Sequence, residues 1–583
     1  MVYGRWIMKR SNLLAIAVSL GTASFLLCGA SFAPSVLASS KKATSISINA
    51  ANFPNAAFRE YVREFDLDNN GSFSEKELKY ITDIDISENT AVTNLKGIEY
   101  FTFLEALTCD DDNISSLDLS KNTRLFYLSC ENNNISSLNL SNNKNLEVLY
   151  CENNNLTTIN LTSNPELYGL YVSGNPITSL NVSKNPKLDT LDCADTKIST
   201  LNVSANPLLT WINCYDCKNL SSIDVTKCTN LETLSLGNTK VSSINVTKNT
   251  KLTSLDLYNT YISSLNVKNN PKLDVLDCGD TDVSSLDVSK NTLLTHMVVS
   301  GTLITSLNVS NCKKLEFLYC CNTKLSTLNI SNNRNLKTLD VSITKISTLD
   351  ISSCPYLLTT YAANIVELFE YEKVYMYDDK KEEMTYYLYI NPTATVRTTP
   401  GALSTLSASP AGKNAVKISW QFSGVADGYL IYGQKNGKYG YVGMTTTGKT
   451  FTDKKALSEN YNYYWVFPYT KDTKGNMYVG SCTKYVFAKG ICPAVTNLKA
   501  TSVKGGVKLT WTASAGAEGY LIYGIVDGKP YKYIGMTSGT TFTDKTASST
   551  QYNYYWVYPY FKNSNDKMIV GLTGNYTYGK ALP

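Results

Sequence analysis

Hydrophobic positions recur through the middle of the chain with a fixed period. The leucines that open the first units are Leu104, Leu125, Leu146 and Leu167, which are 21 residues apart. This spacing continues to Leu357 except for one longer step before Leu231. Within a unit the apolar positions follow L-x-x-L-x-[C/L/V]-x-x-[N/T/C]-x-[I/L/V], which matches neither a helical period nor simple strand alternation. Because a unit of this length cannot bury its leucines alone, the period predicts a stack of similar turns, a solenoid.

This spacing is that of a leucine-rich repeat, in which each unit contributes one short parallel strand and a return segment. Position six of the unit is cysteine, valine or leucine, which indicates a buried apolar slot rather than a chemical site. Free thiols are favoured over disulfides, because side chains stacked at the strand spacing of about 4.8 Å keep their Cβ atoms further apart than a relaxed bridge prefers. The cysteines of this column are Cys109, Cys130, Cys151, Cys193, Cys214, Cys278 and Cys320.

Two polar columns mark the turns of the repeat. We expect the asparagine or threonine at position nine to satisfy backbone groups where the chain leaves the strand. A second asparagine column includes Asn122 and Asn143, with Cys228, Cys312 and Cys354 as replacements. We expect this second column to serve the opposite turn.

From about residue 401 the repeat gives way to a duplication at an offset of 91. The segments VKISW and VKLTW match, as do YNYYWVFPY and YNYYWVYPY, and glycine-rich turns separate such alternating segments. With one early tryptophan in each copy, Trp420 and Trp511, the pattern predicts two β-sandwiches. They resemble fibronectin type III modules. A disulfide between Cys482 and Cys492 is an open alternative to free thiols.

Residues 66–77, DLDNNGSFSEKE, precede the repeats and match an EF-hand calcium loop. The segment 54–65 has helical apolar spacing behind Asn52, the expected N-cap. The alternative is a polar turn that only starts the cap. A single loop without a partner predicts one weak Ca²⁺ site, with a dissociation constant of about 10⁻⁴–10⁻³ M. The expected metal ligands are Asp66, Asp68, Asn70, Ser72, Ser74 and Glu77.

Residues 1–38 have the features of an export signal: three basic residues, then an apolar run, then small residues near Ala38. A membrane anchor is the alternative, although the run is short and rich in small residues. Charge divides unevenly, since residues 401–583 carry 20 lysines and 8 acidic residues, whereas residues 39–400 have a net charge of −10. The basic tail either reflects ordinary solvation or adheres to an anionic surface such as a wall polymer.

The predicted fold class is α+β, mainly β: a leucine-rich repeat solenoid with parallel strands on its concave face, a small helical N-terminal cap, and two β-sandwich domains. The expected divisions are a signal peptide at 1–38, the cap at 39–91, the solenoid at 92–365, a C-terminal cap and linker at 366–400, and sandwiches at 401–490 and 491–583.

Residues 80–365 resemble the leucine-rich repeats of the internalin class of bacterial surface proteins. The resemblance rests on the 21-residue units, the cysteine column, and VTNLKGIEYFTFLEAL at 92–107, which is similar to the entry repeats of that class. It implies a secreted or surface-associated bacterial binding or adhesion protein. The wall-anchor motif usual in that class is missing, so attachment to the cell wall is left open.

Binding is favoured over catalysis, because the chain has a single histidine, His296, and no familiar nucleophile motif beside it. We expect no enzyme activity, no nucleic-acid partner, no stable membrane span and a monomeric chain. The alternative to recognition by the solenoid is a cell-wall or polysaccharide binder whose basic, tyrosine-rich C-terminal tandem carries recognition, through NGKYGYVGM and GKPYKYIGM.

Strand positions two, three and five of each unit escape the predicted core and combine aromatic rings with carboxylates. Such a surface suits recognition of an extracellular protein or glycan, and drift on a solvated sheet is the alternative. The expected contact residues are Phe126, Tyr127, Tyr150, Tyr168, Tyr171, Asp189, Asp192, Trp211, Asp256, Phe317 and Tyr319.

Overall fold

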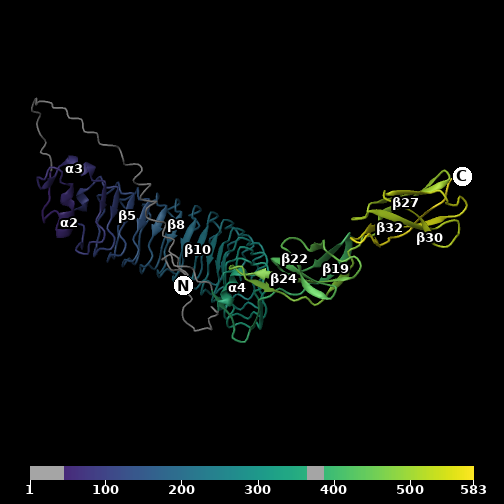
Figure 1. The fold of residues 1–583 in the computed structure, drawn as a ribbon. Helices are drawn as coiled ribbons and strands as arrows, with labels where there is room; N and C mark the ends of the chain where they lie inside the picture. The colour runs from purple at the N-terminus through teal and green to yellow at the C-terminus, as the bar shows by residue number, and fades with distance from the viewer. Residues whose placement is uncertain (1–44, 364–386) are drawn as a thin grey trace, which may run out of the picture. The chain divides into compact units, whose positions relative to one another are not determined.

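A computed structural model describes residues 45–363 and 387–583 (Figure 1). The predicted signal peptide and residues 366–386 of the predicted C-terminal cap lie outside the described residues. The chain divides into two compact units, one that holds most of the solenoid and one that holds its last segments and the sandwiches. Among the described helices, none is long and apolar enough to cross a membrane.

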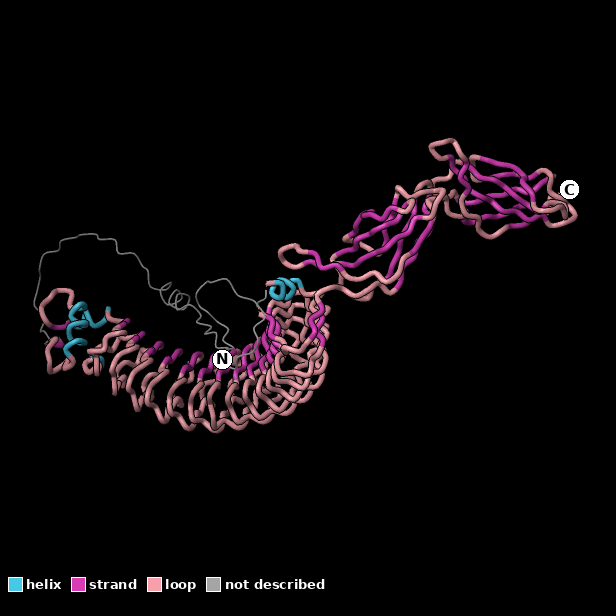
Figure 2. Tube along the Cα trace, turned by 60° about the horizontal axis from the view of Figure 1, so that its bottom comes forward, coloured by secondary structure: helices cyan, strands magenta, loops and turns pink. Residues whose placement is uncertain are grey.

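The first unit is built on a 14-stranded sheet in which neighbouring strands pair in parallel from turn to turn. Leu128 pairs with Leu149, and Leu149 pairs with Leu170, so the register repeats the sequence period and confirms the predicted leucine-rich repeat solenoid. The strands line the inner side of the curve and the loops form its outer side (Figure 2). The strands are β3 (Asp83–Asp85), β4 (Ala106–Thr108), β5 (Tyr127–Ser129), β6 (Val148–Tyr150), β7 (Gly169–Tyr171), β8 (Thr190–Asp192), β9 (Trp211–Asn213), β10 (Thr233–Ser235), β11 (Ser254–Asp256), β12 (Val275–Asp277), β13 (His296–Val298), β14 (Phe317–Tyr319), β15 (Thr338–Asp340) and β17 (Leu388–Tyr389).

Both polar columns bond to the backbone as the sequence predicts. Asn133 Nδ2 donates to the carbonyl of Cys109 at 2.7 Å, and its Oδ1 accepts from the amide of Ile114 at 2.8 Å. On the opposite turn, Asn143 Nδ2 donates to the carbonyls of Leu119 and Asn122 at 3.2 and 2.9 Å. These bonds tie successive turns together, because each asparagine satisfies backbone atoms of the turn before its own.

The cysteine column is a packing column. All seven of its thiols are buried and free, and the remaining described cysteines are free as well. Cys482 and Cys492 form no disulfide with each other; Cys492 is buried, and Cys482 Sγ donates to the carbonyl of Lys484 at 2.9 Å. The column therefore fills apolar space without cross-linking the turns.

The N-terminal cap is a helix, a loop and a second helix laid against the first turn. The predicted Asn52 cap is wrong: helix α2 begins after Asn55, whose side chain accepts from the amide of Phe58 at 2.9 Å. Asn52 instead donates through Nδ2 to the carbonyl of Ser47. The elements of the cap are β1 (Ile46–Ser47), α2 (Ala56–Val62), η1 (Arg63–Phe65), β2 (Ser72–Phe73) and α3 (Glu75–Tyr80), and η2 (Ile98–Tyr100) follows β3.

The last solenoid segments belong to the second unit. Helix α4 (Pro355–Ala362) carries a proline in its first turn, where the missing amide hydrogen costs nothing. Strand β16 (Thr348–Asp350) pairs in parallel with β18 (Thr395–Arg397), so residues 395–397, expected within the cap and linker, are part of a small sheet.

Each C-terminal domain packs a three-stranded sheet against a five-stranded one, as a β-sandwich does. Trp420 packs on Tyr429 in the first core and Trp511 on Tyr520 in the second, with ring centroids 4.9 and 5.2 Å apart. The strands of the first sandwich are β19 (Thr405–Gly412), β20 (Ala415–Gln421), β21 (Gly428–Lys435), β22 (Lys438–Thr445), β23 (Thr450–Asp453), β24 (Asn462–Lys471), β25 (Met477–Val479) and β26 (Val486–Ala488). Those of the second are β27 (Thr496–Val503), β28 (Gly506–Thr512), β29 (Gly519–Ile525), β30 (Lys532–Thr537), β31 (Thr541–Asp544), β32 (Asn553–Lys562), β33 (Met568–Val570) and β34 (Thr577–Gly579).

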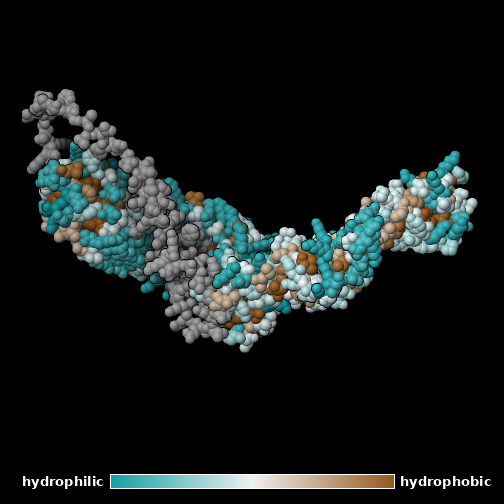
Figure 3. Space-filling model, in the orientation of Figure 1, coloured by the Kyte–Doolittle hydropathy of each residue, from teal (hydrophilic) through white to brown (hydrophobic). Residues whose placement is uncertain are grey.

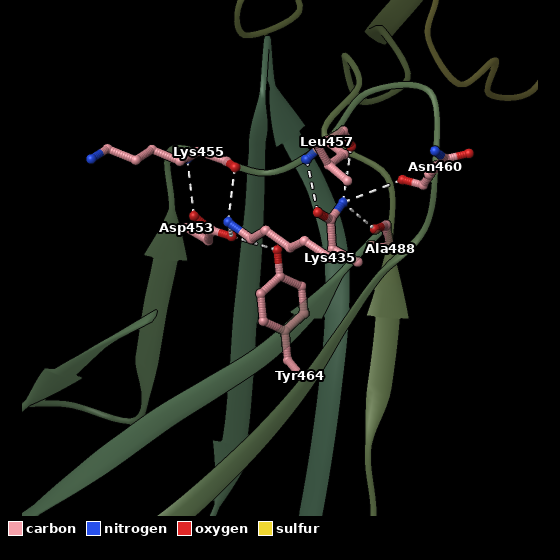
Figure 4. Close-up of polar contacts among 8 residues, drawn as sticks. Lys435, Asp453, Lys455, Leu457, Asn460, Tyr464 and Ala488 are labelled. Atoms are coloured by element: carbon pink, nitrogen blue, oxygen red, sulfur yellow. Dashed lines mark hydrogen bonds and ion pairs between the residues drawn. The ribbon is translucent and has the colours of Figure 1, made fainter. Parts of the chain in front are cut away.

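A buried polar contact fixes which way the side chains of β24 point. Tyr464 Oη donates to Asp453 at 2.7 Å, and Lys435 Nζ lies 2.7 Å from the same carboxylate (Figure 4). The second sandwich repeats the bond with Tyr555 and Asp544 at 2.9 Å. Because Tyr464 is held inward, its neighbours in the strand face outward.

Candidate binding sites

The residues of the predicted calcium loop lie together. Carboxylate oxygens of Asp66, Asp68 and Glu77 lie within 4.8 Å of one another, and among the described residues this is the one group of three or more acidic, histidine or cysteine side chains with metal-binding spacing. Gly71 takes a left-handed conformation at φ 78°, as the sharp turn of such a loop requires. The donor set, the glycine and the helix–loop–helix frame fit a calcium ion.

The remaining loop residues are held by local hydrogen bonds. Asn70 Oδ1 accepts from the amide of Ser72 at 2.9 Å, and Glu77 Oε2 accepts from the amide of Ser74 at 2.7 Å. Hydrogen bonds from the amide and hydroxyl of Ser74 lower the pKa of Glu77, so its carboxylate is charged at neutral pH. Phe73, at position eight, pairs with Ile46 of β1, so a short strand of the same chain takes the place where a second hand would pair.

On the concave face, three tyrosines form a ladder across consecutive strands. The ring centroids of Tyr127 and Tyr150 are 5.9 Å apart, and those of Tyr150 and Tyr171 are 4.3 Å apart with an interplanar angle of 12°. All three rings are half-buried, whereas Tyr168 is 39% exposed. We call Tyr127, Tyr150 and Tyr171 the tyrosine ladder. Trp211, also half-buried, is in register with Tyr127 through the intervening strands, and the half-buried Phe126 directly precedes β5.

Carboxylates follow the same strands. Asp110 is buried and accepts from the hydroxyl of Ser129 at 2.7 Å and the amide of Glu131 at 2.8 Å. Burial, with repulsion from Glu131, raises the pKa of Glu152 to about 9, and Glu152 Oε2 is buried without a hydrogen-bond partner. Burial raises the pKa of Tyr150 first, and the charges of Glu152 and Glu131 raise it further, so these acids lie close to the ladder.

Several predicted contact residues have structural partners. Asp192 accepts from the amide of Ala194 at 3.0 Å, and Asp256 accepts from the amide of Tyr258 at 3.0 Å, so both carboxylates hold the turn after their strand. Asp189 is half-buried near the start of β8.

The contact residues predicted near the end of the solenoid are largely shielded. Phe317 and Tyr319 are only 4% and 8% exposed. His296 stacks on Phe317, with centroids 4.4 Å apart, and is half-buried. The accessible predicted residues therefore gather in the N-terminal half of the solenoid.

Each sandwich also carries an outward aromatic face that the sequence reveals only in part. Along β24 the residues Asn462, Tyr464 and Val466 are buried, while the alternate residues Tyr463 and Trp465 face outward. In the space-filling view the described solenoid surface is mostly hydrophilic, whereas the sandwiches show more pale and brown residues (Figure 3).

Nine rings form a continuous contact network on each face, with the same connections in both copies. We call these the first and second aromatic faces. The first consists of Tyr432, Tyr439, Tyr441, Tyr461, Tyr463, Trp465, Phe467, Tyr485 and Phe487. The second consists of Tyr523, Tyr531, Tyr533, Tyr552, Tyr554, Trp556, Tyr558, Tyr576 and Tyr578.

Comparisons with known proteins give structural likeness only. No protein-family model and no curated protein sequence matches the chain. The structure is similar to the functional domain of InlJ from Listeria monocytogenes, described as including a cysteine ladder, at 23% identity, 77% of this chain, 100% of that chain and a TM-score of 0.47. It is similar to the internalin InlF from the same organism at 23% identity, 52% and 93% coverage and a TM-score of 0.45.

A third similar structure is the leucine-rich repeat ectodomain of the Arabidopsis receptor kinase HAESA in complex with a peptide hormone, at 18% identity, 46% and 51% coverage and a TM-score of 0.41. The leucine-rich repeat fold of this chain is established by its own strand register, and membership in the internalin class remains a proposal.

Proposed function

We propose that the chain is a non-enzymatic, internalin-like binding protein of the bacterial exterior, whose solenoid holds a cationic segment of a protein ligand on its concave face. The tyrosine ladder carries this proposal. Stacked, half-exposed rings on adjacent strands offer a large contact area whose rotamers are already restricted, so little entropy is lost on binding.

The charge beside the ladder favours a basic ligand. Burial first, and then repulsion from Glu131 on the neighbouring turn, raises the pKa of Glu152 to about 9, so Glu152 holds a proton at neutral pH that a cation bound beside it would help to release. A lysine or arginine side chain on the ladder would lie near these acids and over a ring face, and both contacts attract a cation. A neutral glycan would gain only the second kind of contact.

The calcium loop of the N-terminal cap supports a location outside the cell. We propose that Asp66, Asp68, Asn70 and Glu77 hold Ca²⁺ with their side chains, Ser72 with its carbonyl and Ser74 through water. The ion would join the loop between α2 and α3 and brace the first turn of the solenoid. Millimolar calcium outside cells suits the weak affinity expected of one unpaired loop, which agrees with the export-signal pattern of residues 1–38.

A peptide-binding experiment tests the ligand class. The purified chain is measured against immobilised peptides of matched length that are basic, neutral or acidic, at two salt concentrations. We expect preferential binding to basic peptides, weaker at high salt, and a loss of at least about tenfold, roughly 1.4 kcal/mol, in Tyr150→Ala/Tyr171→Ala.

Tyr261→Ala is the matched control, because Tyr261 is a 62% exposed tyrosine of the solenoid outside the strands. Tyr168→Ala/Trp211→Ala extends the test to the neighbouring strands. Binding that is indifferent to peptide charge, or equal loss in the Tyr261 variant, would contradict the proposal.

A second candidate function is the wall-polymer or polysaccharide binder in which the C-terminal tandem carries recognition. The two aromatic faces favour it, and it does not compete with the solenoid proposal because it uses other residues. We propose that the sandwiches are fibronectin type III modules. If the solenoid alone carries recognition, they act as spacers.

A further inference from the structure

We propose that the two aromatic faces are a pair of equivalent binding platforms for an anionic polysaccharide, and that one polymer chain engages both. This inference deepens the second candidate function and is independent of the tyrosine ladder. The rings at the outer strands are accessible to a ligand: Tyr439, Tyr441, Tyr531 and Tyr533 are 45–55% exposed. Monomers rarely leave so large a contiguous ring surface without a partner.

The faces are preorganised. Tyr432 stacks on Tyr439 with an interplanar angle of 8°, and Tyr523 stacks on Tyr531 at 14°. Each ring is braced by at least one neighbour in the network, so little entropy is lost when a ligand orders it. The other contacts of the network are edge-to-face or tilted, so rings of different orientation are available to sugar rings, which present C–H faces for stacking and hydroxyl groups for the phenol oxygens at the rim.

The duplication indicates which feature of the rings is used. Phe467 of the first face corresponds to Tyr558 of the second, and Phe487 corresponds to Tyr578, whereas the other seven positions are identical. All nine positions carry an aromatic ring in both copies, whereas two of them lack the hydroxyl in the first copy. This difference indicates that both faces bind their ligand by stacking. Two copies of one platform fit a ligand that presents the same surface repeatedly, namely a polymer.

Charge selects an anionic polymer. Residues 401–583 carry 20 lysines against 8 acidic residues. Lys489 Nζ lies 5.1 Å from the ring centroid of Tyr461, and Lys580 Nζ lies 4.7 Å from that of Tyr552, the equivalent place on the second face. This excess of positive charge opposes pairing with a second copy of the same face and attracts carboxylate or phosphate groups on a sugar chain.

The test uses the full chain and four immobilised probes: polygalacturonate, which has sugar rings and charge; dextran, which has rings without charge; polyphosphate, which has charge without rings; and single-stranded oligodeoxythymidine. The variants are Tyr439→Ser/Tyr441→Ser on the first face, Tyr531→Ser/Tyr533→Ser on the second, and both pairs combined. Tyr261→Ser is the control for loss of an exposed tyrosine elsewhere.

We expect the strongest binding to polygalacturonate, a loss of about tenfold or more for either single-face variant through lost avidity, and no measurable binding for the combined variant. Lys489→Gln/Lys580→Gln, which leaves every ring in place, should weaken binding and reduce its salt dependence. Unchanged thermal unfolding of each variant shows that the fold is kept.

The inference would be overturned by equal binding to polyphosphate, equal binding to dextran, tighter binding to oligodeoxythymidine, or polygalacturonate binding that survives in the combined variant. Concentration-dependent dimerisation that the combined variant abolishes would assign the faces to self-association instead. Tyr150→Ala/Tyr171→Ala must leave polygalacturonate binding unchanged, so failure here and failure of the solenoid proposal are distinguishable.

Discussion

Asn185 illustrates what one residue contributes to the solenoid. It is fully buried, and its Nδ2 donates to the carbonyls of Leu161 and Asn164 at 3.1 and 2.7 Å. Asn185→Ala leaves both carbonyls without this donor, so we expect the free energy of unfolding to fall by about 1–3 kcal/mol. Urea denaturation measures the change.

A second substitution at this position tests whether a thiol can replace the amide. The column already accepts cysteine: Cys228 Sγ lies 3.8 and 3.7 Å from the carbonyls of Val203 and Asn206. Asn185→Cys should therefore cost less than Asn185→Ala. Equal costs would mean that neither the volume of the thiol nor its weak S–H donor replaces what the amide supplies.

Glu152 makes stability depend on pH. Its folded pKa of about 9 lies above its ordinary value of 4.5. Between these values the unfolded chain releases a proton that the folded chain keeps, so this residue lowers stability as pH rises from about 5 to 9. Glu152→Gln removes the effect, and we expect it to stabilise the protein at pH 8 by at least about 1 kcal/mol and to leave stability at pH 4 nearly unchanged.

Thermal unfolding of wild type and variant across pH 4–9 measures this effect. Glu147→Gln is the matched control, because Glu147 is exposed just before β6. Glu166 is unsuitable as a control because it pairs with Lys187. A pH dependence that persists in Glu152→Gln would assign the effect to other acids.

At the scale of single residues, sequence reasoning succeeded where one repeated position has one use and was incomplete where a position has two. The asparagine columns were predictable because every turn leaves the same backbone atoms unpaired. Asp192 and Asp256 were expected to face a ligand, but a short carboxylate at the end of a strand can also accept the amide two residues on, and the period does not distinguish these uses. The Asn52 cap failed because Asn55 offers the same chemistry three residues later.

The cysteine column is a property of stacked elements, since each thiol faces the core at the same place in its turn. Burial raises the pKa of the Cys109, Cys151 and Cys320 thiols far above the usual value, so almost no thiolate is available at pH 8. We expect iodoacetamide to modify the half-exposed Cys482 in the native protein and the column only after denaturation. Peptide mass spectrometry reads the sites, and native labelling of the column would contradict its burial.

The outward aromatic faces show how an element-level pattern is missed. YNYYWVFPY contains two interleaved sets, one buried and one outward, but nearly all of its residues are aromatic or apolar, so polarity does not reveal which set faces the solvent. The hydrogen bond from the buried Tyr464 to Asp453 determines which set faces inward, and Asp453 lies 11 residues away on another strand. The strict alternation, which both copies of the duplication repeat, is the feature of the sequence that indicates one outward set of rings.

For the whole molecule, the period and the duplication determined the architecture: a short repeat of fixed length has to stack, and two matching sets of alternating strands have to form two sandwiches. The same reasoning could not place residues 388–397, which pair as β17 and β18 although they carry no repeat signature. Such short strands form because the preceding strand leaves backbone groups unpaired at the edge of its sheet. That edge exists only in the folded solenoid, so the sequence of the segment does not reveal it.

Calcium should act on one unit of the molecule and leave the other alone, because the loop of Asp66–Glu77 belongs to the unit with most of the solenoid. At a calcium concentration about 100 times the dissociation constant, binding stabilises the state that holds the ion by about 2.7 kcal/mol. Calorimetry of the full chain should show the transition of the solenoid unit moving up with calcium while that of the sandwiches stays in place.

Glu77→Gln sharpens this last test, because glutamine at the same helix position can still complete the capping box with Ser74 but lacks the charge that a bidentate calcium ligand supplies. The variant should fold without calcium and lose the calcium response. Glu75→Gln is the matched control, since Glu75 lies outside the ligand set and pairs with Lys79 on the surface. If calcium leaves the solenoid transition unmoved in the wild type, or moves it equally in Glu77→Gln, then the loop is a polar turn that starts the cap.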